Sequence, residues 1–451
     1  MTGSRREFQG VTLVIGLFLL SSCAPLRSYI APETNLPDSY SVGSSAGQPV
    51  EDWWRALNDP TLNLITEQAL AQSLELAIAR NEVDQASAAL SGTSGWLSGG
   101  LSANAAHSFD GNTATRGQLS LALPFGRDVR IARTTALARW QGAVMGEADA
   151  RRRVALDVTK AFIELRYLQR LQVFLRQDLT SRKEIESWAE LRVSRGITTE
   201  IDLTQAKAAR VKIEADIAKA DAEVMAKLHQ IATIVGVPLE DVGVRLMDPG
   251  RQPLPEGMPS IGYPADFLRN RPDVRRADRA YAAAISQLNA ATAARYPRLS
   301  LGGTIDLESG QASENVFAGI LLPVFDQPRL KAAERQAEAA TEGALLAWKQ
   351  SVLAALAEVE IAAQKFAGSR RTAERAHVAL KLNEEAAAFY LNSMQQGGPV
   401  TALDILNQQQ ALTDARLAAA NSLRDVALNY VELRTAIGMP LDVDATVDPE
   451  N

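Results

Sequence analysis

Few residues of this chain combine types and spacings that could support catalysis or metal binding. It has one cysteine, Cys23, so no internal disulfide can form, and its three histidines are scattered along the chain. No phosphate-binding loop, nucleophile elbow, paired-histidine zinc motif or Cys-x-x-Cys motif occurs. Carboxylate pairs such as Glu358 and Glu360 fall on a helical pattern that we interpret as solvated. We therefore expect no enzymatic activity and no metal or other cofactor apart from a covalent lipid.

Cys23 stands at the end of a secretory signal sequence. Two arginines precede an apolar run over 11–20, which is too short to span a bilayer, and Leu20-Ser21-Ser22-Cys23 follows. This motif resembles the bacterial lipobox, whose cysteine is acylated and becomes the new N-terminus. Ala24 follows, not the aspartate that tends to retain such lipoproteins at the inner membrane. We expect a lipid on Cys23 and an outer-membrane location; the alternative is an ordinary signal peptide with an incidental cysteine.

Two acidic residues occupy equivalent places in the chain. Asp202 and Asp404 each follow a glycine, Gly196 or Gly398, by six residues. In a threefold assembly a pore-facing acid becomes a ring of three like charges, which selects for cations and resists closure. Alternatively, both acids stabilise the positive ends of helix dipoles. We favour the pore-facing position for Asp404, and both explanations stay open for Asp202.

The chain also repeats itself. The segment 196–203 can be laid over 398–405 at an offset of 202 residues, and at the same offset Gly236-Val-Pro238-Leu239 falls on Gly438-Met-Pro440-Leu441. Upstream, Leu123-Pro124 matches Leu322-Pro323 at an offset of 199 residues. Three matches in one order indicate a tandem duplication.

Each half follows one plan: a helix, a hairpin of alternating strands, a very long helix and a second helix. Alanine dominates an apolar content of 46%, and aromatic residues make up only 6%, which favours long, closely packed helices. The sequence predicts helices over 62–91, 129–194, 199–235, 272–295, 329–395 and 401–437, with strand patterns over 119–123, 299–307 and 316–322.

The fold class that this pattern predicts is mainly α with a small β part. A helix of roughly 65 residues is about 100 Å long, so it must pack along other helices in a coiled coil or tube. Four strands cannot close a barrel, and open strand edges are not tolerated in lipid. Several protomers must therefore share one barrel. The predicted units are a signal peptide (1–22), an anchored extended segment (23–59), the first repeat (60–247), a crossing linker (248–264), the second repeat (265–441) and a tail (442–451).

Several motifs, in one order over about 50–440, resemble the TolC family of outer-membrane channels, and within it the lipidated OprM-like, NodT-type branch that serves RND efflux pumps. The first is the segment from Trp53 to Leu62. Arg271-Pro272-Asp273-Val274 opens the second half, where we interpret it as a helix start with Asp273 at the positive end of the dipole. Three further matching segments are Tyr296-Pro297-Arg-Leu299-Ser-Leu301, Pro323-Val-Phe325-Asp326 and residues 401–407.

The resemblance implies a homotrimer with a 12-stranded barrel in the outer membrane lipid and a long α-helical periplasmic tunnel. It also implies two partners, a periplasmic adaptor (membrane fusion protein) and an inner-membrane RND transporter. Asp404 falls where the family carries a constricting acidic ring, and Asp202 matches an acid that helps to tie the closed tip. Asn407 stands where a second acid is usual, and Gln410 and Val400 stand where some relatives are basic. The predicted gate is thus less charged than usual.

The function that these features favour is a passive, gated exit duct of a tripartite RND efflux system. The net charge of −6 gives no support to nucleic-acid binding. Within the channel class, the duct of a type I protein secretion system is the alternative, although the lipobox and the Arg-Pro-Asp-Val motif favour efflux. A periplasmic coiled-coil adaptor or structural protein without a pore is the alternative from another class, and the alternating hairpin segments argue against it.

Overall fold

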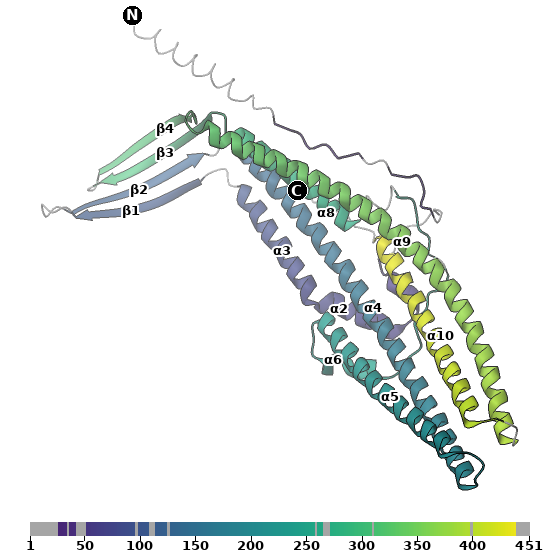
Figure 1. Cartoon of the computed structure of the whole chain (residues 1–451). Helices are drawn as coiled ribbons and strands as arrows, with labels where there is room; N and C mark the ends of the chain where they lie inside the picture. The colour runs from purple at the N-terminus through teal and green to yellow at the C-terminus, as the bar shows by residue number, and fades with distance from the viewer. Residues whose placement is uncertain are drawn as a thin grey trace, which may run out of the picture.

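The structure, a computed structural model, describes an elongated molecule with β-hairpins at one end and helical turns at the other (Figure 1). The described residues are 26–33, 36–41, 51–94, 98–107, 113–123, 127–257, 259–264, 271–308, 311–396 and 400–438. The signal peptide, Cys23, Gly398 and the predicted tail lie outside them. Among the described helices, none is both long and apolar enough to cross a membrane.

In the first half, one helix of 68 residues, α4, dominates. The helix after it, α5, ends at Gly236, whose φ is +85° and where a Cβ would come within 2.8 Å of the carbonyl oxygen of Gln72. Only glycine fits that position without displacing the backbone of the neighbouring segment. The elements are η1 (Trp53–Leu57), α2 (Pro60–Gln72), α3 (Leu74–Ser91), η2 (Gly92–Ser94), β1 (Ser98–His107), β2 (Thr113–Leu123), α4 (Arg127–Ser194), α5 (Glu200–Val235) and α6 (Leu239–Met247).

The second half follows the same order, and its long helix, α9, has 69 residues. The predicted helices are confirmed with small shifts at their ends, while the last strand begins five residues earlier than its pattern indicates. The elements are α8 (Pro272–Ala293), β3 (Arg298–Glu308), β4 (Gln311–Leu321), α9 (Gln327–Gln395) and α10 (Ala402–Ile437).

Besides β2, which begins six residues before its strand pattern at Leu119, two helical details of the first half differ from the prediction. The single helix expected over 62–91 is broken at Ser73, whose extended backbone (φ −56°, ψ 130°) ends α2 and begins α3. Leucine and alanine continue at helical spacing through this residue, so a one-residue kink leaves the apolar pattern intact. Pro238 stops α5, as expected, but it also precedes the short helix α6, which the pattern did not indicate.

The four strands form one antiparallel sheet in the order β1-β2-β3-β4. The central pairing joins the two halves of the chain, from Arg116 opposite Glu308 to Leu123 opposite Leu301. In the described part of the chain, β1 pairs only with β2 and β4 only with β3. The sheet of one protomer therefore has two open edges.

The helices continue the order of the strands. α4 packs between α3 and α8, and α8 packs against α9, so these four helices form one curved layer below the sheet. Alanines at the contact of α4 and α8, such as Ala138, Ala282 and Ala283, let the two backbones approach closely. Further from the sheet, α5 lies along α4, and α10 lies along both α9 and α4.

Large buried side chains gather around the middle of the molecule. There α2, α4, α5, α9 and α10 enclose the indole rings of Trp53 and Trp54, which stack edge to face at 5.8 Å, and the rings of Phe162 and Phe366. This cluster anchors the two long helices to the shorter ones, and from it the helix pairs extend toward their turns.

An extended segment near the N-terminus, residues 26–33 and 36–41, lies along α8 and α9; we call it the strap (Figure 1). The backbone N–H of Arg27 donates to Asn289 Oδ1 at 2.8 Å, and Asn289 Nδ2 donates back to the carbonyl of Arg27 at 2.9 Å. The hydroxyl of Tyr29 donates to Asp278, and the backbone N–H of Ser41 donates to Glu360 at 2.7 Å. The strap is thus attached at intervals to one face of the helix layer.

Candidate functional site

The candidate site is the end of the molecule furthest from the sheet, where α4 turns into α5 and α9 turns into α10; we call it the tip. In the first turn Gly196 has a φ of +66°, and the N–H of Ile197 donates to the carbonyl of Arg192 at 2.9 Å. This hydrogen bond satisfies one of the last carbonyls of α4, and the left-handed backbone that it needs is available to glycine without strain.

Asp202 stands at the third position of α5 and completes a capping box. Its carboxylate accepts a hydrogen bond from the hydroxyl of Thr198 and another, at 3.4 Å, from the backbone N–H of Thr199. The hydrogen bond from Thr198, supported by those from Thr199, holds the pKa of Asp202 below its usual range. The carboxylate therefore stays ionised at neutral pH and stabilises the start of α5.

Asp404 repeats this arrangement at the start of α10. The hydroxyl of Thr401 donates to its carboxylate at 2.6 Å, the N–H of Thr401 donates at 3.0 Å, and the N–H of Asp404 donates to the hydroxyl of Thr401 at 3.1 Å. The hydrogen bond from the Thr401 hydroxyl, followed by the one from its backbone, lowers the pKa of Asp404. Unlike Asp202, which is half-buried, Asp404 is exposed.

Both acids thus stabilise the start of a helix, as one of the two explanations from the sequence requires. Capping engages one face of each carboxylate through local hydrogen bonds and does not neutralise its charge. An exposed, ionised Asp404 can cap its helix and face a pore at the same time. The two explanations that the sequence left open are therefore compatible for this residue.

The two other predicted gate residues differ in their surroundings. Asn407 is exposed and makes no side-chain hydrogen bond to the described residues. The side-chain carbonyl of Gln410 accepts from Arg182 Nη2 at 3.2 Å, and its amide nitrogen donates to Asp414 at 2.9 Å. Gln410 is thus placed in a contact between α10 and α4.

That contact belongs to a polar set that we call the Asp178 network: the buried Asp178, Arg182 and Gln409, and the half-buried Gln410. The side chains of Asp178 and Arg182 are 2% and 5% exposed and form an ion pair at 3.4 Å, and Gln409 Nε2 donates to Asp178 at 3.0 Å. The network ties α4 to α10 by hydrogen bonds from Arg182 to Gln410 and from Gln409 to Asp178. Sequence reasoning missed three of its four residues, although an aspartate four residues before an arginine in a long helix was an available signal.

Below the turns, a small apolar cluster joins α4, α5 and α10. It comprises Ile185, Ala189, Leu203, Ala206, Ile405 and Leu406. Arg210 of α5 adds an ion pair with Glu186 of α4 at 2.6 Å. The tip of one protomer is therefore held together by small contacts, while Gly196 in the first turn and the capping acid Asp404 are exposed.

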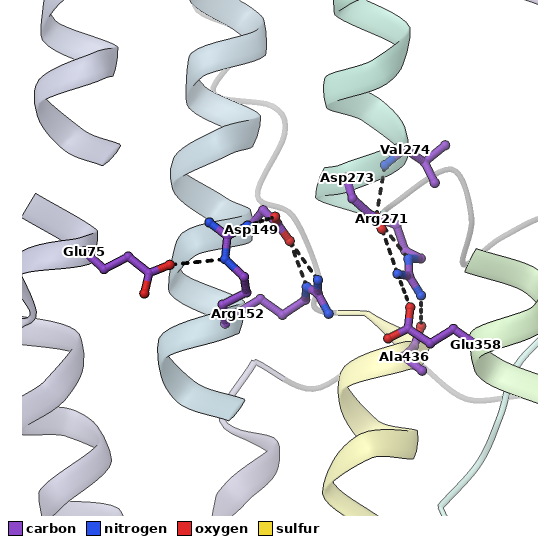
Figure 2. A network of polar contacts seen from close by, with 9 residues as sticks. Glu75, Asp149, Arg152, Arg271, Asp273, Val274, Glu358 and Ala436 are labelled. Carbon is purple, nitrogen blue, oxygen red and sulfur yellow. Dashed lines mark hydrogen bonds and ion pairs between the residues drawn. The ribbon is translucent and has the colours of Figure 1, made fainter. Parts of the chain in front are cut away.

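A second polar constellation lies near the middle of the molecule, and we call it the Arg271 network: Arg271, Asp273, Glu358 and the carbonyl of Ala436 (Figure 2). The guanidinium of Arg271, 3% exposed, donates to Asp273 at 2.7 Å, to Glu358 at 2.5 Å and to the carbonyl of Ala436 at 2.7 Å. It joins the start of α8 to α9 and to the end of α10. In the same view, Asp149 of α4 accepts from Arg152.

The Arg271 network corrects part of the sequence-based interpretation. Pro272 and Asp273 do begin a helix, as expected. Glu358 and Glu360 are not merely solvated, however: Glu358 pairs with Arg271, and Glu360 accepts from Ser41 of the strap. Burial alone would raise the pKa of Asp273, but hydrogen bonds from Arg271 and its charge outweigh burial and hold that pKa below its usual range. These carboxylates therefore have structural partners in the fold.

Comparisons with known proteins agree with this architecture. The family model for outer membrane efflux proteins matches residues 264–439. The Nodulation protein T of Rhizobium leguminosarum bv. viciae is 30% identical over 93% of this chain and 91% of its own length. The pyoverdine export outer membrane protein OpmQ of Pseudomonas aeruginosa is 24% identical over 96% of both chains. The crystal structure of the Campylobacter jejuni CmeC outer membrane channel shares the fold, with a TM-score of 0.82 at 18% identity over 92% of this chain and 95% of that one.

Proposed function

Because the chain belongs to the outer membrane efflux protein family, we propose that it is the exit duct of a tripartite pump, working with a periplasmic adaptor and an inner-membrane transporter of the RND class. The family consists of outer-membrane efflux channels, which are not enzymes, and this chain is such a channel. The export named for the related OpmQ protein supports an efflux role over protein secretion.

The observation that supports a duct is the open four-stranded sheet, from which the layer of long helices extends. In lipid, each unpaired strand edge would leave backbone N–H and C=O groups without partners. Pairing the β1 edge of one copy with the β4 edge of the next satisfies both edges. Three copies then close a barrel of twelve strands, and their helix layers continue it as a tube.

Cys23 anchors this assembly in our proposal. The strap begins at residue 26, three residues after Cys23, and follows the helix layer away from the sheet. An acylated Cys23 would hold the N-terminal end of the strap at the lipid surface. One acyl chain gives only marginal membrane binding, so firm anchoring needs several chains or the barrel itself.

The gate of the duct is the tip, with a ring of three Asp404 carboxylates as its constriction. Asn407, one turn away, adds a polar but uncharged ring, and Asp202 stabilises the neighbouring turn. Gln410 takes part in the closed state through the Asp178 network, because α10 cannot swing away from α4 without breaking its contact with Arg182. Opening therefore requires that a partner, such as the adaptor, compensates for the lost hydrogen bonds.

Reconstitution of the full-length protein tests the proposal. Native mass spectrometry should show a trimer, and planar bilayers should show small conductance that rises in Arg182→Met, which releases α10 from α4. Lys212→Met, an exposed change on α5, is the matched control and should conduct like the unmodified protein. A monomer, or an absence of current in every variant, would contradict the duct.

A further inference from the structure

The four-helix layer has two faces, and the strap marks one of them. On α8, the strap contacts Asp278 and Asn289. On α9, it contacts Glu338 through Arg27 at 2.7 Å and Glu360 through Ser41. The opposite face carries a groove between α3, α4 and α8. The groove is lined by residues that include Asp128, Ile131, Thr135, Arg139, Gln287 and Ala290.

The strap face is the outside of the duct that we propose, and the inference below rests on that proposed function. A strap along the inner face would obstruct the lumen, and its N-terminal end could not reach lipid outside the barrel. The grooved face, with Arg139, is therefore the lumen side. Every residue of the layer can then be assigned to one side by its position on its helix.

Four basic residues lie on the outer face just below the sheet: Arg130 and Arg133 of α4, and Lys331 and Arg335 of α9. We call them the basic collar. At 100° per residue, Arg130 and Arg133 are turned about 130–170° away from the groove side of α4. Lys331 and Arg335 lie seven and three residues before Glu338, so they share the face of α9 that contacts the strap.

The collar residues are exposed and form no ion pair with any described residue. The acids nearest to them already have partners, because Glu334 pairs with Arg295 and Glu338 with Arg27. Asp128 and Asp326 are likewise paired, with Arg127 and Arg329, and the exposed Glu342 lies further along α9 from the strands. The collar is therefore a zone of uncompensated positive charge.

The collar also lies at the height of lipid headgroups. The four side chains stand three to eight positions after the first residue of α4 or α9. They therefore lie within about 12 Å of the helix starts below the sheet. The headgroup layer on each side of a bilayer is about 5–8 Å thick. Long basic side chains extend several ångströms further along a surface, so all four can reach that layer.

We infer that the basic collar binds the phosphates of anionic phospholipids in the periplasmic leaflet of the outer membrane. Guanidinium groups match phosphate oxygens with paired hydrogen bonds, and an exposed cluster of Lys and Arg beside a membrane attracts anionic headgroups. Three copies would surround the barrel with twelve positive charges, and the strap places the anchored N-terminus beside them. The collar thereby sets the depth of the duct in the membrane.

The test uses the full-length trimer, stripped of lipid in detergent and titrated with fluorescent phosphatidylglycerol or phosphatidylcholine. Phosphatidylglycerol should bind more tightly, and added salt should weaken it. One basic residue at an anionic surface contributes about 1 kcal/mol, or roughly fivefold. Arg130→Gln with Arg133→Gln should therefore raise the Kd about 25-fold, as should Lys331→Gln with Arg335→Gln.

Arg139→Gln is the matched control, because it removes the same charge from the same helix but from the lumen side. Its Kd for phosphatidylglycerol should equal that of the unmodified protein. Equal binding of both lipids, an unchanged Kd in both double variants, or an equal loss in Arg139→Gln would overturn the collar. Trimer mass and conductance are measured on the same samples, so a conducting trimer without lipid preference refutes the collar alone, and a protein that neither assembles nor conducts refutes the duct.

Discussion

Asp273 near the middle of the molecule and Asp404 at the tip begin as the same device, an acid in the first turn of a helix after a break in the chain. Their surroundings then diverge. Asp273 is paired with the buried guanidinium of Arg271, which also binds α9 and the end of α10. Among the described residues, the side chain of Asp404 is hydrogen bonded to Thr401 alone, three residues away, and it remains exposed.

The difference separates a charge that stabilises the fold of one protomer from a charge that stays available at the surface. In the Arg271 network the carboxylates neutralise a cation that would be costly to bury alone, so they stabilise the junction of three helices. At the tip the cap is satisfied locally, and the negative charge still faces solvent. If the tip moves as the gate that we propose, local contacts of this kind leave it free to do so, because they do not bind it to distant elements.

The largest expected effect comes from breaking the Arg271 network. Arg271→Met leaves Asp273 and the carbonyl of Ala436 without their partner in a mostly buried setting, which should cost about 3 kcal/mol of folding free energy. The thermal unfolding midpoint of the full-length protein, followed by circular dichroism in detergent, should fall. Glu358→Gln removes a carboxylate whose side chain is 46% exposed, and should cost less than about 1 kcal/mol. Equal losses of folding free energy in both variants would show that the burial of Arg271 does not decide how much the network stabilises the fold.

A smaller effect on stability and a larger one on conduction are expected at the tip. Asp404→Ala should raise single-channel conductance and weaken cation preference severalfold, because it removes three charges from the constriction that we propose. Asp202→Ala is the matched variant, since it also loses an acid from a capping box but at a half-buried position. If both variants conduct like the unmodified protein, the two acids are helix caps and nothing more.

Much of this arrangement could be predicted from the sequence. The long runs without proline, the breaks near Gly196 and Gly236 and the alternating strand residues indicate the helices and strands closely, because these signals are local. The break at Ser73 and the helix α6 were missed because neither changes the local pattern. A kink of one residue does not disturb an apolar pattern, and a proline that ends one helix can precede the next.

The polar networks were harder to predict, because their partners are far apart in the chain. Arg271 meets Ala436 across 165 residues, and Gln409 meets Asp178 across 231. Nothing in the local pattern tells a buried arginine from a solvated one in an Ala-rich helix. The capping acids, in contrast, were recognisable, since Thr199 with Asp202 and Thr401 with Asp404 have the three-residue spacing of a capping box.

The smallest effect, and the sharpest separation of the two regions, is expected from acid pH. The pKa of Asp273 is lower in the folded protein than its usual value of 3.8, so the unfolded chain binds the proton more readily. The stability that Asp273 contributes is therefore fully present above about pH 4 and is lost as the pH falls through the folded pKa. The difference in unfolding midpoint between the unmodified protein and Asp273→Asn should be constant at neutral pH and shrink below about pH 4.

The lowered pKa of Asp404 predicts that cation preference likewise stays constant through neutral pH and declines in acid, without a matching change in stability. If Asp404→Asn lowered the unfolding midpoint as well as the cation preference relative to the unmodified protein, Asp404 would contribute to the fold as Asp273 does.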